Sequence, residues 1–153
     1  MRPRKVMLPF DGSPPARRAL EYVAAMDQGG DFQVHVLYVQ APTIDDEVYL
    51  PPLLAEAERI VRVASRYLEA RSISHVTRVA VGYPSDTIVR HAKAERCTEI
   101  VMGVRTALAR FFSGSISRRV AGLADLPVTL VKATGEATFK GPGARQLAGA
   151  TLE

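Results

Sequence analysis

The chain has 153 residues, with 20 Lys and Arg against 16 Asp and Glu, so its formal net charge is +4 and its pI is about 9.5. This length predicts one domain, and the 47% apolar and 24% charged content is typical of a globular protein and excludes disorder along the whole chain. The single cysteine, Cys97, excludes an intramolecular disulfide. The sequence shows neither an apolar run of ~20 residues nor a signal-peptide core. We therefore expect a soluble, cytoplasmic protein with no membrane segment.

Segments with strand-like and helix-like apolar spacing alternate along the first 132 residues. The predicted strands are short and apolar, and they lie at 5–10, 32–39, 76–81, 99–102 and 126–131. The predicted helices begin after Ser13, at about 51, after Ser85 and near 114. The repeated strand–helix order predicts an α/β fold, a single open five-stranded parallel sheet of Rossmann-like type with helices on both faces.

Two segments are predicted to lie outside these elements. Residues 40–50 form a long acidic connection between the second strand and the second helix. Residues 133–153 are rich in glycine and show little apolar periodicity. We therefore expect a domain over 1–132 followed by a flexible C-terminal tail over 133–153.

The ends of the first and fourth strands are the first candidates for a binding site, because ligands of open parallel sheets bind beyond the carboxyl ends of the strands. Asp11 follows the first strand, where its carboxylate suits a ribose hydroxyl or stabilises the Asp-Gly turn. Gly103 ends the fourth strand, and Gly114-Ser115 opens the next helix. The free N–H groups of a helix start suit a phosphate, although a Gly-Ser cap also occurs without a ligand.

The excess positive charge lies in residues 90–119, which carry seven basic and two acidic groups. This stretch is typical of a solvated helix face or of a small-anion site near residue 103. A nucleic-acid surface is disfavoured, because the only aromatic residues in the stretch are Phe111 and Phe112.

The remaining candidates favour structural roles. His35 lies within a predicted strand and is interpreted as a core residue, and Cys97 as a small apolar packing residue. Neither His75 nor His91 has a carboxylate or thiol at metal-ligand spacing, and no nucleophile-and-base pattern is present. We therefore predict no metal site and no catalytic residues.

Several short motifs, in this order and spacing, resemble the universal stress protein family. The resemblance covers about residues 4–132, and its motifs are Val6–Ser13, Ala19-Leu20, Gly82-x-Pro84, Ile100–Gly103, Ser113–Ser117 and Leu126–Val128. It implies the strand order 3-2-1-4-5. It also implies a homodimer in which the last strands of two subunits pair, here through Val128, Thr129, Leu130 and Val131.

One branch of that family binds ATP or AMP, with Mg²⁺ present only together with the nucleotide. By resemblance, Asp11 would contact the nucleoside and the backbone of Val39 the adenine. Met102 and Gly103 would flank the sugar and phosphates, and the helix start at 114–116 would hold the phosphates. The full set of implied binding residues is Pro9, Asp11, Val39, Met102, Gly103, Arg105, Thr106, Gly114, Ser115 and Ile116.

The sequence departs from the family's nucleotide-binding motif in one loop. Position 106, where the motif has a second glycine, holds Thr, and the connection to Gly114 is shorter than in the motif. Arg105, Thr106 and Arg110 would compensate in part with charge and a hydroxyl.

Two functions therefore stay open. The first is a stress-response protein that binds an adenine nucleotide, with at most slow ATP hydrolysis. The second is a dimeric interaction module that binds no nucleotide and acts through an unknown protein partner.

Overall fold

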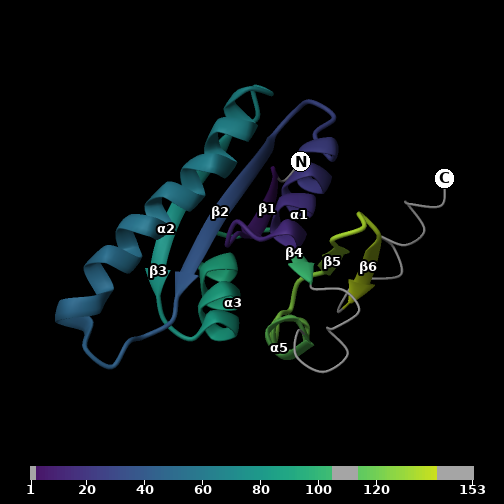
Figure 1. Ribbon diagram of the computed structural model, residues 1–153. Coiled ribbons are helices and arrows are strands. Elements are labelled where there is room, and N and C mark those ends of the chain that lie inside the picture. The colour runs from purple at the N-terminus through teal and green to yellow at the C-terminus, as the bar shows by residue number, and fades with distance from the viewer. Residues whose placement is uncertain (1–2, 105–113, 141–153) are drawn as a thin grey trace.

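A computed structural model describes residues 3–104 and 114–140 of the chain. Six strands form one sheet in the order β3-β2-β1-β4-β5-β6 (Figure 1). The strands are β1 (Arg4–Pro9), β2 (Phe32–Gln40), β3 (His75–Val81), β4 (Glu99–Val104), β5 (Val128–Lys132) and β6 (Ala137–Lys140). The first five are parallel to one another, which confirms the predicted sheet and its 3-2-1-4-5 order.

The sheet has one strand more than the sequence predicts. β6 runs antiparallel to β5, with a register from Val128 opposite Lys140 to Val131 opposite Ala137. The connecting turn contains Gly135 at φ +90°, a backbone conformation that glycine adopts readily. This strand lies in the segment predicted as a flexible tail, and it covers the edge of β5 at which the resemblance implied a subunit interface.

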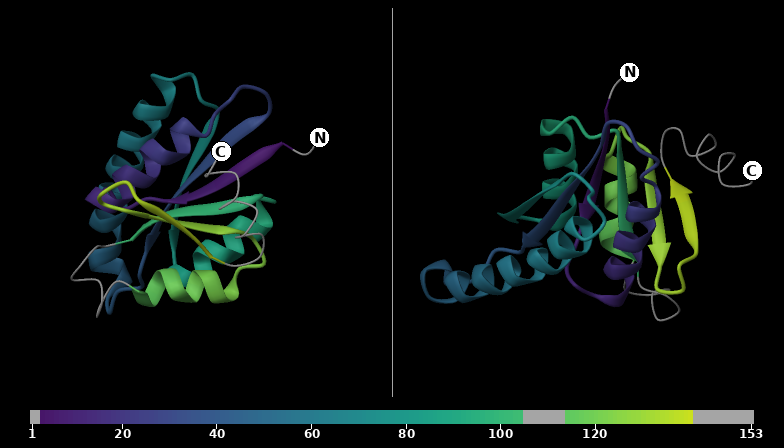
Figure 2. Two further views of the ribbon diagram at one scale, coloured as in Figure 1. Left: turned by 90° about the vertical axis from the view of Figure 1, so that its right-hand side faces the viewer. Right: turned by 90° about the horizontal axis from the view of Figure 1, so that it is seen from above.

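Helices cover both faces of the sheet (Figure 2). α1 (Pro14–Ala25) and α2 (Asp46–Glu69) pack with Val6, Leu8 and Val36 on one face, whereas α3 (Pro84–Ala94) and α5 (Gly114–Leu123) pack with Met7 and Ile100 on the other. Alternate residues of β1 thus point to opposite helical layers, as the period of a strand requires. No helix in the described part of the chain is long and apolar enough to cross a membrane.

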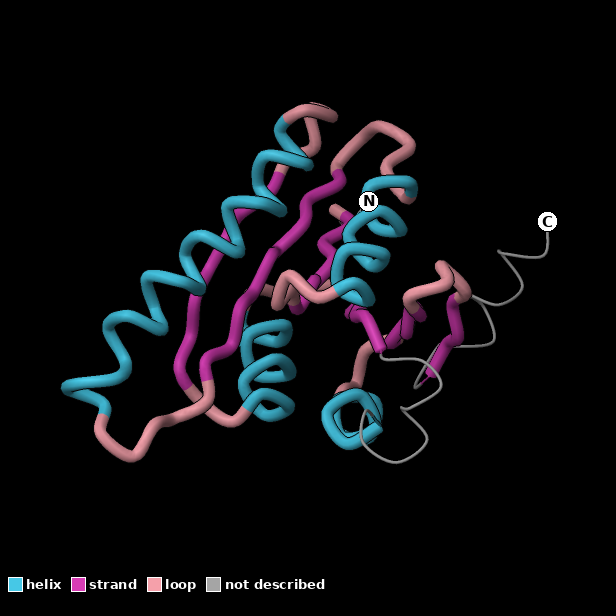
Figure 3. Tube along the Cα trace, in the orientation of Figure 1, coloured by secondary structure: helices cyan, strands magenta, loops and turns pink. Residues whose placement is uncertain are grey.

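The second helix begins earlier than predicted, at Asp46 and not at about 51. The Asp45 side chain caps it by accepting a hydrogen bond from the Val48 N–H at 3.3 Å, and two acidic residues in the first turn favour the positive end of the helix dipole. Pro51 and Pro52 therefore lie inside the helix. The N-terminal part of α2 extends beyond the strands, and a loop joins it to β2 (Figure 3).

The other helix starts are set by local chemistry. Ser13 caps α1, as predicted, with Pro14 and Pro15 in the first turn. The N-cap residue of the third helix is Tyr83, whose side chain makes no capping hydrogen bond, and not Ser85, which is buried in the first turn. Pro84 occupies the first helical position, where a missing N–H costs little.

Candidate functional site

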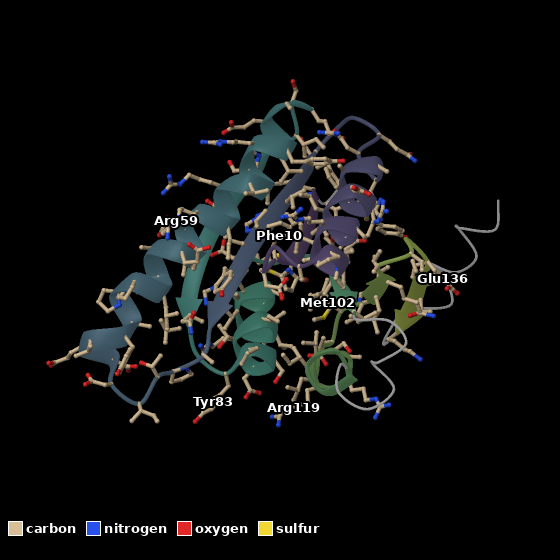
Figure 4. All side chains as sticks on the ribbon, viewed as in Figure 1. Phe10, Arg59, Tyr83, Met102, Arg119 and Glu136 are labelled. Carbon is tan, nitrogen blue, oxygen red and sulfur yellow. The ribbon has the colours of Figure 1, made fainter. Side chains whose placement is uncertain are left out.

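A cavity of about 280 Å³ lies at the carboxyl ends of β1, β2 and β4, between the first turns of α1, α3 and α5. Six of the predicted binding residues line it: Pro9, Asp11, Val39, Met102, Gly103 and Ile116. Gly114 and Ser115 open α5 beside them, whereas Arg105 and Thr106 lie outside the described residues. In Figure 4, Phe10 and Met102 lie in the interior, and Tyr83 and Arg119 lie at the end of the molecule toward which β2 points.

The turn between β1 and α1 fixes Asp11 at the cavity. Its Oδ1 atom accepts a hydrogen bond from the Ser13 N–H at 2.9 Å, while Ser13 Oγ accepts one from the Ala16 N–H at 3.4 Å. Gly12 between them has φ +78°, which favours glycine. The carboxylate thus stabilises the turn with one oxygen. Its Oδ2 atom makes no hydrogen bond to a described residue, and this exposed oxygen remains available to a ligand.

Gly103 allows the tip of β4 to touch the start of α1. A Cβ atom at this position would lie 2.3 Å from the Pro15 carbonyl carbon and 2.6 Å from the Ala16 nitrogen. Real carbon atoms do not approach this closely, so any larger residue would displace α1 or β4. The glycine is therefore needed for packing, and the same close contact shapes the cavity floor.

The walls of the cavity are mainly apolar. β2 contributes Leu37 and Val39, α3 contributes Ile88, β4 contributes Met102 and α5 contributes Ile116. Ile116 is 43% exposed, so its apolar side chain is accessible to a ligand in the cavity. An apolar slot with a few polar groups at its rim suits a planar ring that carries polar substituents.

Reasoning from strand ends alone did not identify Leu37, Ile88 or Ser117 as lining residues. Ile88 lies on the buried face of α3, and its place in the cavity depends on which strand end this helix covers. That placement depends on the packing of α3 against the sheet.

Three helix starts meet at the cavity, and they differ in what they offer an anion. At α1, Pro14 and Pro15 lack N–H groups and the next N–H is bonded to Ser13. At α3, Asp86 places a carboxylate in the first turn. α5 has neither proline nor an acidic residue at its start. The N–H groups that a helix start presents and the positive end of the helix dipole make it the best of the three for a phosphate.

The basic stretch does not form one patch around this cavity. Of its described members, Lys93 and Arg96 lie at the far end of α3 and line a different cavity at the amino ends of the strands. Arg118 and Arg119 are exposed on α5, and Arg119 lies 3.8 Å from Asp86. The predicted single anion site near residue 103 therefore accounts for only part of the positive charge.

The histidines and the cysteine have structural environments. Nε2 of the buried His35 lies 2.9 Å from Gln33 Oε1, and burial lowers the pKa of its imidazole. The His75 ring bridges Ser65 Oγ and the Ile73 carbonyl oxygen, each at 2.8 Å. Burial, with a smaller effect from Glu95, raises the pKa of the Cys97 thiol to about 11. Among the described residues, no group of three His, Cys, Asp or Glu could hold a metal ion.

Comparison with known proteins agrees with this architecture. A family model described as the universal stress protein family matches residues 3–132. A protein of Thermus aquaticus, "Universal stress protein in QAH/OAS sulfhydrylase 3′ region", is 32% identical over 138 residues, which are 84% of this chain and 98% of the relative.

Two solved structures share the fold. One is a universal stress protein family protein from Arabidopsis thaliana with AMP bound, with a TM-score of 0.68 and 20% identity over 85% of this chain and 92% of that one. The other is a universal stress protein in complex with cAMP, with a TM-score of 0.68 and 20% identity over 87% of this chain and 99% of that one.

Proposed function

The chain belongs to the universal stress protein family, and from this premise we propose that it binds an adenine nucleotide, AMP or ATP, at the carboxyl ends of β1 and β4. The observation that carries the proposal is the cavity that brings Asp11, Val39 and Ile116 together beside the start of α5. The AMP and cAMP complexes of the two structural neighbours support the same ligand class.

Each part of the nucleotide has a partner of suitable chemistry in this proposal. The adenine lies in the apolar slot between Val39 and Ile116. The ribose hydroxyls donate hydrogen bonds to the free carboxylate oxygen of Asp11. The phosphates accept hydrogen bonds from the N–H groups at the start of α5. Mg²⁺ would enter only with the phosphates, because the described residues hold no metal-binding cluster of their own.

A nucleotide-free interaction module is the second candidate. The observation that favours it is the size of the cavity, about 280 Å³, which is at the lower limit of small-molecule pockets. Thr106, where the family's nucleotide motif has a glycine, favours it too. In this alternative the protein acts as a stress-response module through a protein partner.

Calorimetric titration of the full chain with AMP and with ATP separates the two candidates. We expect binding at micromolar to millimolar concentration, weakened about tenfold or more by Asp11→Ala, because a hydrogen bond to a charged group contributes ~1.5–3 kcal/mol. Gly114→Val should also weaken ATP binding, since the new side chain crowds the phosphates. Absence of binding at millimolar nucleotide would instead favour the interaction module.

Asp27→Ala provides a matched control. Asp27 is a second aspartate whose Oδ1 accepts a hydrogen bond from the N–H two residues on, that of Gly29, at 3.0 Å. It lies just after the far end of α1, away from the cavity. Both variants lose a carboxylate and a turn hydrogen bond. Because only Asp11 lies at the cavity, only Asp11→Ala should weaken nucleotide binding. Equal effects would show that Asp11 acts through the fold alone.

A further inference from the structure

A larger cavity, of about 880 Å³, lies at the opposite end of the sheet from the proposed nucleotide site. It is bounded by the amino ends of β1 and β4 and by the C-terminal ends of α3 and α5. Its interior is apolar and includes Ile100, Ala124 and Leu126. Leu123 also lines the cavity and is 47% exposed. Ile100 and Ala124 are buried, so Leu123 and the half-buried Leu126 provide the apolar surface that solvent reaches.

Three basic side chains, one from β1 and two from the end of α3, line this cavity. They are Lys5 on β1, Lys93 on α3 and Arg96 just after α3, and the one acidic residue in the lining is Asp125. The charged lining groups thus sum to +3 − 1 = +2. None of the three cations forms an ion pair with a described residue, although six other ion pairs occur there. An excess of cations around an apolar surface favours an anionic ligand.

The backbone holds Arg96 in a left-handed conformation at the end of α3. The Cys97 N–H bonds to the Ala92 carbonyl at 2.9 Å and the Arg96 N–H to the Lys93 carbonyl at 3.1 Å, which is the Schellman pattern that ends many helices. The residue at the left-handed position of this pattern is usually glycine, whereas Arg96 is held there at φ +55°. An arginine at this position costs about 1–2 kcal/mol of backbone strain. Ser72 after α2 has the same hydrogen-bond pattern and also φ +55°, so the strain belongs to the helix end, and glycine at position 96 should relieve it.

We propose that this cavity binds an amphipathic organic anion, a molecule with an apolar body and a single carboxylate or phosphate head. The apolar body packs against Leu123 and Leu126, and the head pairs with Lys5, Lys93 and Arg96. A volume of about 880 Å³ is within the ~300–1,000 Å³ range of small-molecule pockets. This site shares no lining residue with the nucleotide cavity, so it does not depend on the proposed nucleotide function.

Dodecanoate, dodecyl phosphate and dodecanol form a set of probes that share a chain and differ in the head. Each is titrated below its self-association concentration into the ¹⁵N-labelled full chain, by calorimetry and by amide NMR shifts. We expect the two anions to bind once per chain and to shift the amides of Cys97, Thr98 and Leu123. The tighter of the two identifies the head group. Dodecanol should bind at least tenfold more weakly, because it cannot pair with the cations.

Two charge reversals on one helix test the site. Lys93→Glu should weaken anion binding about tenfold, because it replaces an attraction with a repulsion. Arg90→Glu makes the same change on an exposed part of α3 that does not line the cavity, and it should have little effect. Equal weakening by both variants would show nonspecific attraction and overturn the proposal.

Arg96→Gly separates ligand binding from stability. It removes a cation and also places glycine at the left-handed position. We expect weaker anion binding together with a higher urea midpoint, a pair of changes that a purely structural arginine would not give. Dodecanol binding as tightly as dodecanoate, anion binding unchanged in Arg96→Gly, or amide shifts away from this cavity would each overturn the proposal.

Discussion

At the scale of single residues, Gly103 is the position at which the fold and the candidate site depend on the same atom. Gly103→Ala would place a Cβ atom 2.3 Å from the backbone of Pro15, which cannot rotate away as a side chain could. We expect a loss of about 1–3 kcal/mol in the free energy of unfolding, as for other overpacked sites. Urea denaturation followed by circular dichroism measures it.

Gly122→Ala is the control for this change. Gly122 lies in α5, and a Cβ atom there would meet nothing within 4 Å. Alanine is favoured over glycine within a helix by ~0.5–1 kcal/mol, so this variant should be slightly more stable than the wild type. If both alanine variants were stabilised, the close approach of β4 to α1 would not exist in solution.

Cys97 should be nearly unreactive in the folded protein. It is 5% exposed, and burial raises the pKa of its thiol to about 11, so little thiolate is present at neutral pH. Labelling with a disulfide reagent at pH 8 should be slower by at least about a hundredfold in buffer than in denaturant, since both access and ionisation are restricted. Rapid labelling of the native protein would contradict the packing of this residue.

At the scale of elements, the apolar periods predicted the five parallel strands, but two features of the chain could not be read from them. The prolines at 51 and 52 suggested a helix start, whereas the cap at Asp45 lies a turn and a half upstream. β6 is short and only half-buried, and it has weak periodicity because it pairs at an edge. Its stability depends on the free hydrogen-bonding groups of β5, which are visible only once the sheet is assembled.

The pairing of β6 with β5 bears on the proposed homodimer. Intermolecular pairing through Val128–Val131 requires that the β5 edge be free, and β6 occupies this edge. Truncation after Lys132 removes β6 and should increase self-association, because it exposes a strand whose residues are nearly all buried. Sedimentation measures the mass of the full chain and of the truncated protein.

Truncation after Lys140 is the matched control. It removes residues 141–153 and keeps β6, so its oligomeric state should equal that of the full chain. If both truncations behaved as the full chain does, the subunit interface would lie elsewhere than on β5.

At the scale of the whole molecule, the sequence predicted the first cavity but not the second. Parallel topology brings strand ends together, so Asp11 and Gly103 could be placed at one site before any contact was known. The topology also brings together Lys5, Lys93 and Arg96. They lie at the amino ends of the strands, and the rule that ligands bind at the carboxyl ends gives no reason to expect a site there. The described basic residues of the 90–119 stretch thus separate in space, because α3 spans the thickness between the two ends of the sheet.

The response of stability to pH is a property of the whole fold that His35 should dominate near neutrality. Burial lowers the pKa of its imidazole, Glu95 raises it by less, and Lys5 and Arg78 lower it further. The unfolded state, with a pKa of about 6.5, then binds more protons than the native state below neutral pH. The free energy of unfolding should therefore fall as the pH drops from 7 to 5.

His35→Leu should reduce this fall, because it removes the group that titrates. Urea midpoints of both proteins at pH 7, 6 and 5 measure the difference, with His91→Gln as the control for a less buried imidazole whose pKa burial also lowers. An equal fall in the wild type and His35→Leu would mean that His35 is protonated in the folded protein.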